Sequence, residues 1–387
     1  MAFPKGFNIT GIKGEDNKNL SLIYAPSGMK AAAVFTTNSN VAHPVEFSSM
    51  NMKSPLHRAV LVNKGIANAA TGSMGKQKLD EIVNWICEEL NITSSELLIA
   101  STGTIGQQLD ITRKQIKDLV SIKSRIEPEL FSELIMTTDT VPKTATRSFF
   151  LGATAVTIYG ISKGSGMIMP NMATMLGFIM TDAEIDKETL KELMNCVNSV
   201  SFNCLNVDGE TSTNDAVFLL SSGKAADSKI TLDTEKYNEF YRYLKEVCIE
   251  LVEKMARDGE GATKLVILGI NGAENNAKAI QAARAISSSP LCKTAFHGAS
   301  PNWGRIISAL GASGVEVDIE EFDLNIDDME WIKKGSPVVE NDEKIRSILK
   351  KDRYKLMINL NNGSGRATVY TCDYSPEYIS INAGYVS

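Results

Sequence analysis

One threonine occupies a place where it could act as a nucleophile. The stretch KGSGMIMPNMATMLGFIMTD (163–182) begins with glycines, becomes apolar and carries Thr174 at the start of a strand-like run. A threonine at a chain N-terminus needs no histidine, because its own α-amine accepts the hydroxyl proton. That amine has a reference pKa of about 7.7–8.0, so part of it is neutral near pH 7. Thr174 would gain such an amine only if the chain were cut before it.

The hydroxyl of Thr174 could make this cut itself. Its oxygen would attack the carbonyl carbon of Ala173, and water would hydrolyse the resulting ester. The preceding Gly164, Gly166 and Pro170 suit a bent approach to the scissile bond, and the small Ala173 leaves room for a tetrahedral intermediate. The alternative is that ATMLGFIM is an ordinary buried strand containing a β-branched residue. The residues alone leave both interpretations open.

The sequence lacks the motifs of the commoner catalytic sites. It contains no phosphate loop of the form GxxxxGK[ST], no complete GxGxxG after a strand, no GxSxG elbow and no HExxH zinc motif. Its few histidines follow no zinc or Ser–His pattern, and no cysteines form a CxxC pair, so buried free thiols are expected. The residues concerned are His43, His57, His297, Cys87, Cys196, Cys204, Cys248, Cys292 and Cys372.

The composition narrows the class of partner. The 387-residue chain has a net charge of −6 and a pI of about 5.4. This argues against nucleic acid or an anionic membrane as the main partner. No apolar run reaches the roughly 18 residues that a membrane span needs, and the N-terminus lacks the apolar stretch of a signal peptide. We therefore expect a cytoplasmic protein.

The elements that must position Thr174 alternate irregularly between helix and strand. Such mixed order, without a compositional boundary, predicts an α+β fold and no doubly wound sheet. Asp186 is expected to cap the helix that follows the Thr174 strand. The expected helices cover 79–90, 187–197, 235–255, 275–287 and a segment after Asn302; the expected strands cover 97–101, 152–160, 174–181, 265–270, 292–297 and a C-terminal hairpin with a last strand.

Several long motifs resemble those of one enzyme family. KGSGMIMPNMATMLGFIMTDA is similar to the signature of the glutamate N-acetyltransferase (ornithine acetyltransferase) family of arginine biosynthesis. Other blocks resemble that family in the same order along essentially the whole chain, which makes the likeness highly specific. These blocks are STGTIG (101–106), MTTDTVPK (136–143), FNCLNVDGETSTND (202–215), RDGEGATK (257–264), PNWGRI (301–306) and INAGYVS (381–387).

The resemblance implies a self-processed molecule. The family's precursor cuts itself before the Thr of its ATML motif, here between Ala173 and Thr174. Residues 1–173 and 174–387 would then form α and β fragments of one intertwined catalytic unit, and two of each would make a heterotetramer. The implied fold is an α+β sandwich with α/β/β/α layers, which the family shares with self-processing aminopeptidases, and Thr174 would open a central strand.

The implied reaction is acetyl transfer in two steps. The new N-terminal Thr174 would take acetyl from N-acetylornithine, form an acetyl-enzyme and pass the acetyl group to glutamate, with the α-amine acting as base and then as acid. No metal or organic cofactor is required. Some family members also charge the threonine from acetyl-CoA, which would then be a co-substrate and would make the enzyme bifunctional.

Further roles carry over by position. The family uses the residues that match Thr102 and Gly103 as its oxyanion hole. Lys163 matches a substrate contact, and a cation there suits an amino-acid carboxylate. Within TTDT, motif spacing favours Thr137 over Thr138 and Thr140 as a substrate contact. Glu260 would suit the ornithine ammonium, and Asn382 and Ser387 match a C-terminal substrate contact.

A few positions depart from the family pattern, and alternatives remain. Lys64, Ile66 and Ala70 differ in the block NKGIANAATG, and Ser300 stands where Asp is usual. These departures leave the acyl donor and the acceptor open, so a paralogue with another acceptor is one alternative. A self-processing amidase or aminopeptidase of the same fold, with water replacing glutamate, is a second. A binding protein that has lost processing is a third.

Overall fold

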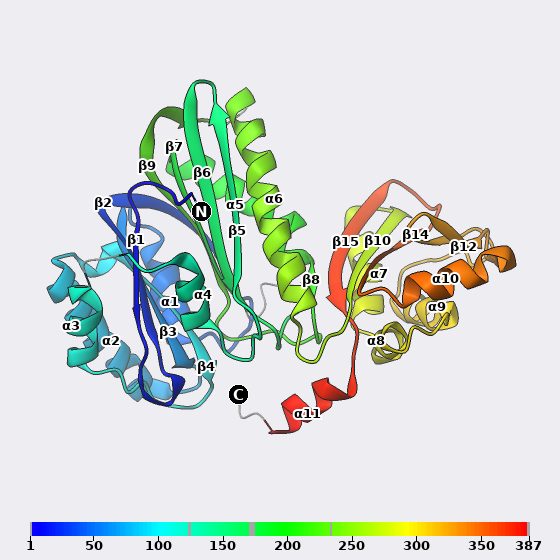
Figure 1. Ribbon diagram of the computed structural model, residues 1–387, viewed down its shortest axis with the longest axis horizontal. Coiled ribbons are helices and arrows are strands. Elements are labelled where there is room, and N and C mark those ends of the chain that lie inside the picture. The colour runs from blue at the N-terminus through cyan, green and yellow to red at the C-terminus, as the bar shows by residue number, and fades with distance from the viewer. Residues whose placement is uncertain (1, 123–124, 170–174, 233, 385–387) are drawn as a thin grey trace.

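The computed structural model describes residues 2–122, 125–169, 175–232 and 234–384. Figure 1 shows two lobes side by side, the first built mainly from the N-terminal two thirds of the chain and the second from the rest. Within the described residues, eight strands form the sheet of the first lobe. They are β1 (Asn8–Ile12), β2 (Leu20–Phe35), β3 (His57–Ile66), β4 (Leu97–Thr104), β5 (Lys143–Leu151), β6 (Thr154–Lys163), β7 (Leu176–Ile185) and β9 (Ala216–Ile230).

The sheet of the first lobe folds over on itself. Its strand order is β4-β3-β2-β9-β7-β6-β5, with β1 paired to β2. The first half of the long strand β2 pairs with β3 and its second half pairs with β9, with an irregularity between Tyr24 and Met29. The two halves of the sheet therefore face each other across a shared core.

Alternation along the strands explains the layers. Side chains of successive residues point to opposite faces of a strand. Val60 and Phe178 lie in the core between the two halves, whereas their neighbours Leu61 and Ile179 face outward. The outward faces are covered by helices, which confirms the predicted α/β/β/α sandwich. The helices of this lobe are α1 (His43–Asn51), α2 (Gly72–Leu90), α3 (Arg113–Ser121), α4 (Pro128–Ile135), α5 (Lys187–Val200) and α6 (Glu235–Arg257), with short 3₁₀ turns η1 (Glu15–Asn17), η2 (Ser94–Glu96) and η3 (Phe202–Cys204).

The second lobe has its own sheet and core. Its strand order is β13-β12-β11-β14-β10-β15-β8. These strands are β8 (Leu205–Asn206), β10 (Leu265–Ala273), β11 (Asp323–Ile326), β12 (Met329–Lys333), β13 (Ser336–Pro337), β14 (Arg353–Asn359) and β15 (Gly365–Cys372). The remaining helices are α7 (Asn276–Ser287), α8 (Pro290–His297), α9 (Trp303–Ala312), α10 (Asp342–Leu349) and α11 (Pro376–Gly384), with the 3₁₀ turn η4 (Val339–Asn341). The last helix, α11, reaches back toward the first lobe (Figure 1).

Most predicted elements are present. The expected helices correspond to α2, α5, α6, α7 and α9, and the expected strands at 97–101, 152–160, 174–181 and 265–270 correspond to β4, β6, β7 and β10. Asp186 caps α5 as predicted, because its side chain accepts a hydrogen bond from the backbone N–H of Thr189. None of the helices in the described ranges combines the length and apolar character needed to cross a bilayer.

Three predictions about the last third of the chain are wrong. Residues 292–297 form part of α8, where Ser289 caps the start and Pro290 begins the first turn. The C-terminal segments do not form a hairpin, because β14 and β15 both pair with β10, which lies between them. The last expected strand is the helix α11. A short apolar run cannot by itself distinguish strand from helix.

Candidate functional site

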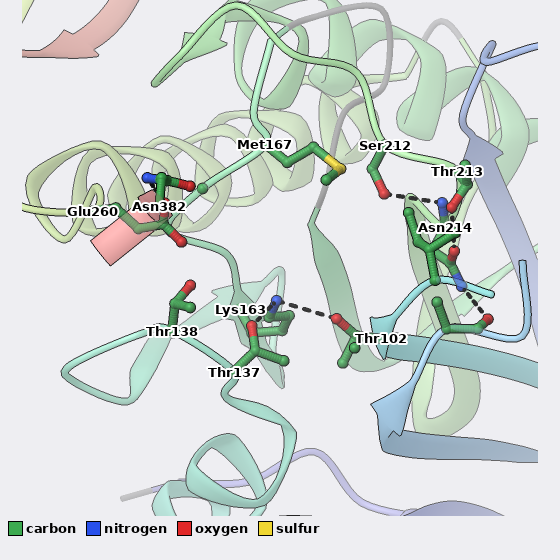
Figure 2. Close-up of a pocket in the computed structure, with 14 residues that line it drawn as sticks. Thr102, Thr137, Thr138, Lys163, Met167, Ser212, Thr213, Asn214, Glu260 and Asn382 are labelled. Atoms are coloured by element: carbon green, nitrogen blue, oxygen red, sulfur yellow. Dashed lines mark hydrogen bonds between the residues drawn. The ribbon is translucent and has the colours of Figure 1, made fainter. Parts of the chain in front are cut away.

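Six of the predicted site residues line one pocket. Thr102, Gly103, Thr137 and Lys163 come from the first lobe, while Glu260 and Asn382 come from segments much further along the chain. Figure 2 shows the side chains of Thr102, Thr137 and Lys163 close together, with Glu260 and Asn382 on another wall. The fold thus brings together residues that sequence motifs had marked separately.

Thr102 and Gly103 lie at the C-terminal end of β4. Gly103 pairs in register with Gly65 of β3. Its φ is +128°, and an added Cβ would lie 2.2 Å from the carbonyl carbon of Gly65. Only glycine fits this close approach of two strands. The backbone of Thr102–Gly103 is therefore fixed beside the pocket, where oxyanion donors would be needed.

Lys163 ends β6 and is almost fully buried, with 2% of its surface exposed. Its Nζ donates to Thr137 Oγ1 at 2.8 Å and to Thr102 Oγ1 at 3.2 Å. Burial lowers the pKa of Lys163, and the nearby Asp139 carboxylate opposes this shift. Lys163 also pairs in the sheet with Leu176, the first residue of β7. The ammonium group is therefore held near the start of that strand.

A buried ionic network supports Lys163 and was not foreseen from the sequence. Lys143 Nζ donates to both Asp139 and Asp258, and Asp139 also accepts the backbone N–H of Gly164 at 2.7 Å. Burial alone would raise the pKa of Asp139, but Lys163 and Lys143 outweigh it and lower the pKa to about 2. Asp139 therefore stays charged, and it fixes the loop that follows Lys163.

Two of the three threonines that were compared in TTDT, Thr137 and Thr138, line the pocket, and the choice of Thr137 as the substrate contact stays a prediction. Thr137 Oγ1 accepts a hydrogen bond from Lys163 Nζ inside the pocket, and the backbone N–H of Thr137 donates to Asp139 Oδ2 at 3.1 Å. Thr138 also lines the pocket, and its hydroxyl hydrogen-bonds the hydroxyl of Ser165 at 2.6 Å. Thr140 instead binds the carboxylate of Asp258 and is absent from the pocket lining.

Glu260 and Asn382 join the second wall. Asn382 Nδ2 donates to Glu260 Oε2 at 2.9 Å, so α11 closes against the loop that carries Glu260. The carboxyl group passes so close to Gly166 that an added Cβ there would lie 2.3 Å from Glu260 Cδ. The glycine thus makes room for the carboxylate. Glu260 itself is 7% exposed, and its oxygens face the pocket (Figure 2).

The predicted nucleophile and cleavage site lie outside the described residues. This holds for Ala173 and Thr174, and also for Ser387. The described chain resumes at Met175, whose backbone N–H donates to Asp215 Oδ1 at 2.8 Å. The carbonyl of Met175 accepts from Ala216 N at 3.2 Å. Residue 175 is thereby anchored on both sides at the beginning of β7.

Asp215 is a residue to which the sequence reasoning gave no role. Its side chain is fully buried, and its Oδ2 has no hydrogen-bond partner among the described residues. Burial raises its pKa well above the usual value, against the opposing effects of the Met175 N–H and Lys163. The block STND that contains it was noted, but no local pattern marks an aspartate as buried next to a strand start.

Substitutions at Asp215 should distinguish a neutral from a charged carboxyl. Asp215→Asn keeps an acceptor for Met175 N without a charge, so we expect the free energy of unfolding to change by less than about 1 kcal/mol. Asp215→Ala leaves the buried N–H unsatisfied and should cost about 1–3 kcal/mol. Denaturant unfolding at pH 7 measures both values. Equal losses in the two variants would show that the side chain works as a carboxylate.

The described lining of the pocket lacks the side chains that most often act as bases, thiol nucleophiles or zinc ligands. None of its described lining residues is a histidine or cysteine, and the departures Lys64, Ile66, Ala70 and Ser300 do not line it either. Burial raises the pKa of Cys87 and of Cys204 to about 11, which disfavours their thiolates. In the described part of the chain, no group of three or more His, Cys, Asp or Glu side chains could hold a metal ion.

Comparison with known proteins gives the same assignment over nearly the full length. The ArgJ family matches residues 6–387. The arginine biosynthesis bifunctional protein ArgJ of Dehalococcoides mccartyi (strain CBDB1) is 41% identical over 391 residues, which cover 99% of this chain and 96% of that protein. The protein of the same name from Chlorobaculum tepidum is 40% identical over an alignment that covers 100% of this chain and 96% of that protein. The crystal structure of arginine biosynthesis bifunctional protein ArgJ from Bacillus halodurans aligns with a TM-score of 0.52 at 40% identity, over 54% of this chain and 98% of that one. The chain belongs to the ArgJ family.

Proposed function

We propose that this protein is a glutamate N-acetyltransferase of arginine biosynthesis, which moves acetyl from N2-acetyl-L-ornithine to L-glutamate through Thr174. The observation that carries the proposal is the pocket itself. It gathers Thr102, Gly103 and Lys163 from the first lobe with Glu260 and Asn382. The strand β7, which follows Thr174 in the chain, pairs with Lys163 at its first residue.

The reaction would begin with cutting of the Ala173–Thr174 peptide bond. The hydroxyl oxygen of Thr174 attacks the Ala173 carbonyl, the amide nitrogen becomes the α-amine, and water releases the ester. The Bacillus halodurans chain supports this step, because 98% of it aligns with only 54% of this chain. It is therefore about as long as residues 174–387 alone.

Acetyl transfer would use the same hydroxyl twice. The Thr174 amine takes the hydroxyl proton as the oxygen attacks the acetyl carbonyl of acetylornithine, and the proton passes to the leaving ornithine nitrogen. The amine of glutamate then attacks the acetyl ester and restores the free hydroxyl. Backbone donors at Thr102 and Gly103 would stabilise the oxyanion in both steps, an effect often worth about 3–4 kcal/mol in the transition state.

The charged residues would orient the two amino acids. Lys163 suits the carboxylate that both substrates carry, and its hydrogen bonds to Thr102 and Thr137 keep it beside the oxyanion position. Glu260 suits the side-chain ammonium of ornithine. The second substrate, glutamate, brings a side-chain carboxylate to the same region, where Glu260 would repel it.

Glu260→Gln tests this division of roles. We expect KM for acetylornithine to rise about 10- to 100-fold, because a charge-assisted hydrogen bond is worth about 1.5–3 kcal/mol. KM for glutamate should stay unchanged or fall, since the repulsion is removed. Steady-state kinetics with each substrate varied in turn gives both values. Glu210→Gln, an exposed carboxylate outside the pocket lining, is the matched control. Equal rises for both substrates would contradict the assigned role.

The main rival is a hydrolase in which water replaces glutamate. Acetylornithine supplied alone and with glutamate separates the two functions. A transferase releases ornithine rapidly only when glutamate is present and forms N-acetylglutamate in equal amount. Release of acetate at a rate independent of glutamate would favour an amidase, and rapid turnover with another amino acid would favour a paralogue with a different acceptor.

A second activity with acetyl-CoA is favoured by the word "bifunctional" in the names of the relatives. Acetyl-CoA would then charge Thr174 in place of acetylornithine. Incubation with acetyl-CoA and glutamate, followed by measurement of free thiol, tests this activity. We also propose that two α and two β fragments form a heterotetramer, which light scattering and intact mass would measure. A location in the cytoplasm stays a prediction.

A further inference from the structure

A second cavity lies at the junction of the two lobes. It has a volume of about 600 Å³ and shares no lining residue with the candidate site. Its walls come from the end of α5, η3 and α6 in the first lobe, and from α7 and β15 in the second. This volume falls in the ordinary range of small-molecule pockets, about 300–1,000 Å³.

The charges around this cavity are all of one sign. Lys245, Arg284 and Arg366 line it, and no aspartate or glutamate is among its described lining residues. None of these three side chains makes an ion pair or a hydrogen bond with a described residue. Three unpaired cations around one cavity stand out in a chain whose net charge is −6.

The carboxylates nearest in sequence are engaged elsewhere. On α6, Glu246 and Glu250 bind Arg147 of β5, and Glu253 binds Arg353 of β14. The positive charge of the cavity is therefore not neutralised by the helix that carries Lys245. An anion from solution would be the natural partner, because like charges brought together without a counter-ion repel.

Arg284 gives the most direct sign of a missing partner. Its Nε is buried and has no hydrogen-bond acceptor among the described residues. Burial also lowers the pKa of this guanidinium. A buried donor of this kind costs free energy until an acceptor reaches it. Arginine is also the side chain best suited to bidentate binding of phosphate or carboxylate oxygens.

We propose that this cavity is a binding site for a small phosphate-bearing molecule, whose anionic groups contact Lys245, Arg284 and Arg366. The rest of the lining suits a ligand with an organic body. Ile249, Ile280 and the ring of Tyr370 offer apolar surface, and a bare phosphate would leave most of the volume unfilled. A nucleoside diphosphate represents this class, with a charged end and a flat, largely apolar end.

Thermal unfolding and calorimetry of the purified protein, with all residues 1–387 present, test the site. ADP is expected to raise Tm by at least about 2 °C when present well above its Kd, because binding to the folded state stabilises it. Inorganic pyrophosphate should give a smaller rise, and uncharged adenosine none. If pyrophosphate raises Tm as much as ADP does, the site binds free phosphate-like anions, and the proposal that the ligand has an organic part is wrong. Equal rises with sulfate at the same ionic strength would overturn the site itself.

Charge-removing variants locate the binding. Arg284→Gln and Arg366→Gln are each expected to weaken ADP binding at least about 10-fold, as expected for loss of a charge-assisted contact. Arg366 is exposed, so its variant should fold even if Arg284→Gln does not. The control is Arg346→Gln, an exposed arginine on α10 that does not line the cavity. An ADP-dependent shift that survives both cavity substitutions, or that is lost in the control, would overturn the assignment.

Discussion

Replacing Thr174 by alanine is expected to abolish both chain cutting and acetyl transfer. The variant lacks the only oxygen that the proposed mechanism uses as nucleophile in either step, so activity should fall by about 10⁴-fold or more. The protein should migrate as one full-length chain on a denaturing gel, with the intact mass of residues 1–387. Mass spectrometry after incubation with acetylornithine should find no acetyl group on residue 174.

Thr174→Ser provides the control for this loss. Serine keeps the hydroxyl and the future α-amine but lacks the methyl group that limits rotation of the side chain. We expect slow cutting and a low but measurable transfer rate. An alanine variant that transfers acetyl at the normal rate would show that another group is the nucleophile, whereas a variant that is cut normally would separate processing from Thr174.

Gly103→Ala is expected to cause the second largest effect. The new Cβ would lie 2.2 Å from the carbonyl carbon of Gly65, and the residue would have to keep a φ of +128°. The end of β4 must therefore shift away from β3, and a displaced donor at Thr102–Gly103 should lower kcat about 10²- to 10³-fold. KM should change less, because the substrate contacts proposed for Glu260 and Asn382 are on the other wall.

Gly106→Ala is the matched control for the backbone effect. Gly106 also has a positive φ, +80°, but an added Cβ there meets no heavy atom within 4 Å. This variant carries the conformational penalty without the clash, which should cost about 1 kcal/mol of stability and little activity. Equal kcat values for the two variants would mean that the close approach of β3 and β4 does not position the site.

The parts of the fold that could be predicted are those with strong local patterns. The helix α6 repeats apolar residues over many turns, and the β-branched run at 152–160 between two glycines predicted most of β6. The segment 292–297 is too short to show a helical or a strand-like hydrophobic period. It is helical because Ser289 caps the helix start and Pro290 suits its first turn. The order of β14, β10 and β15 depends on pairing between strands more than eighty residues apart, which local turn residues do not predict.

In the candidate site, too, some residues were predictable from local motifs and others were not. Lys163, Glu260 and Asn382 were found because they lie in recognisable motifs, and the structure places them around one pocket. The roles of Lys143 and Asp258 depend on a contact across 115 residues, and the burial of Asp215 follows from the packing of β7 against β9. Such groups look like ordinary charged residues until the chain is folded.

The strand order of the first sheet determines how firmly the two fragments stay associated after cutting. From β2 to β6 the order is β2-β9-β7-β6, so the two middle strands follow the proposed cut while the outer two precede it. Separating the two fragments would break the backbone hydrogen bonds of two strand pairs, β2–β9 and β6–β7. The two fragments should therefore not exchange between molecules. When isotopically heavy and light preparations are mixed, no α–β pair with one heavy and one light fragment should appear, and separately expressed fragments should reassemble poorly.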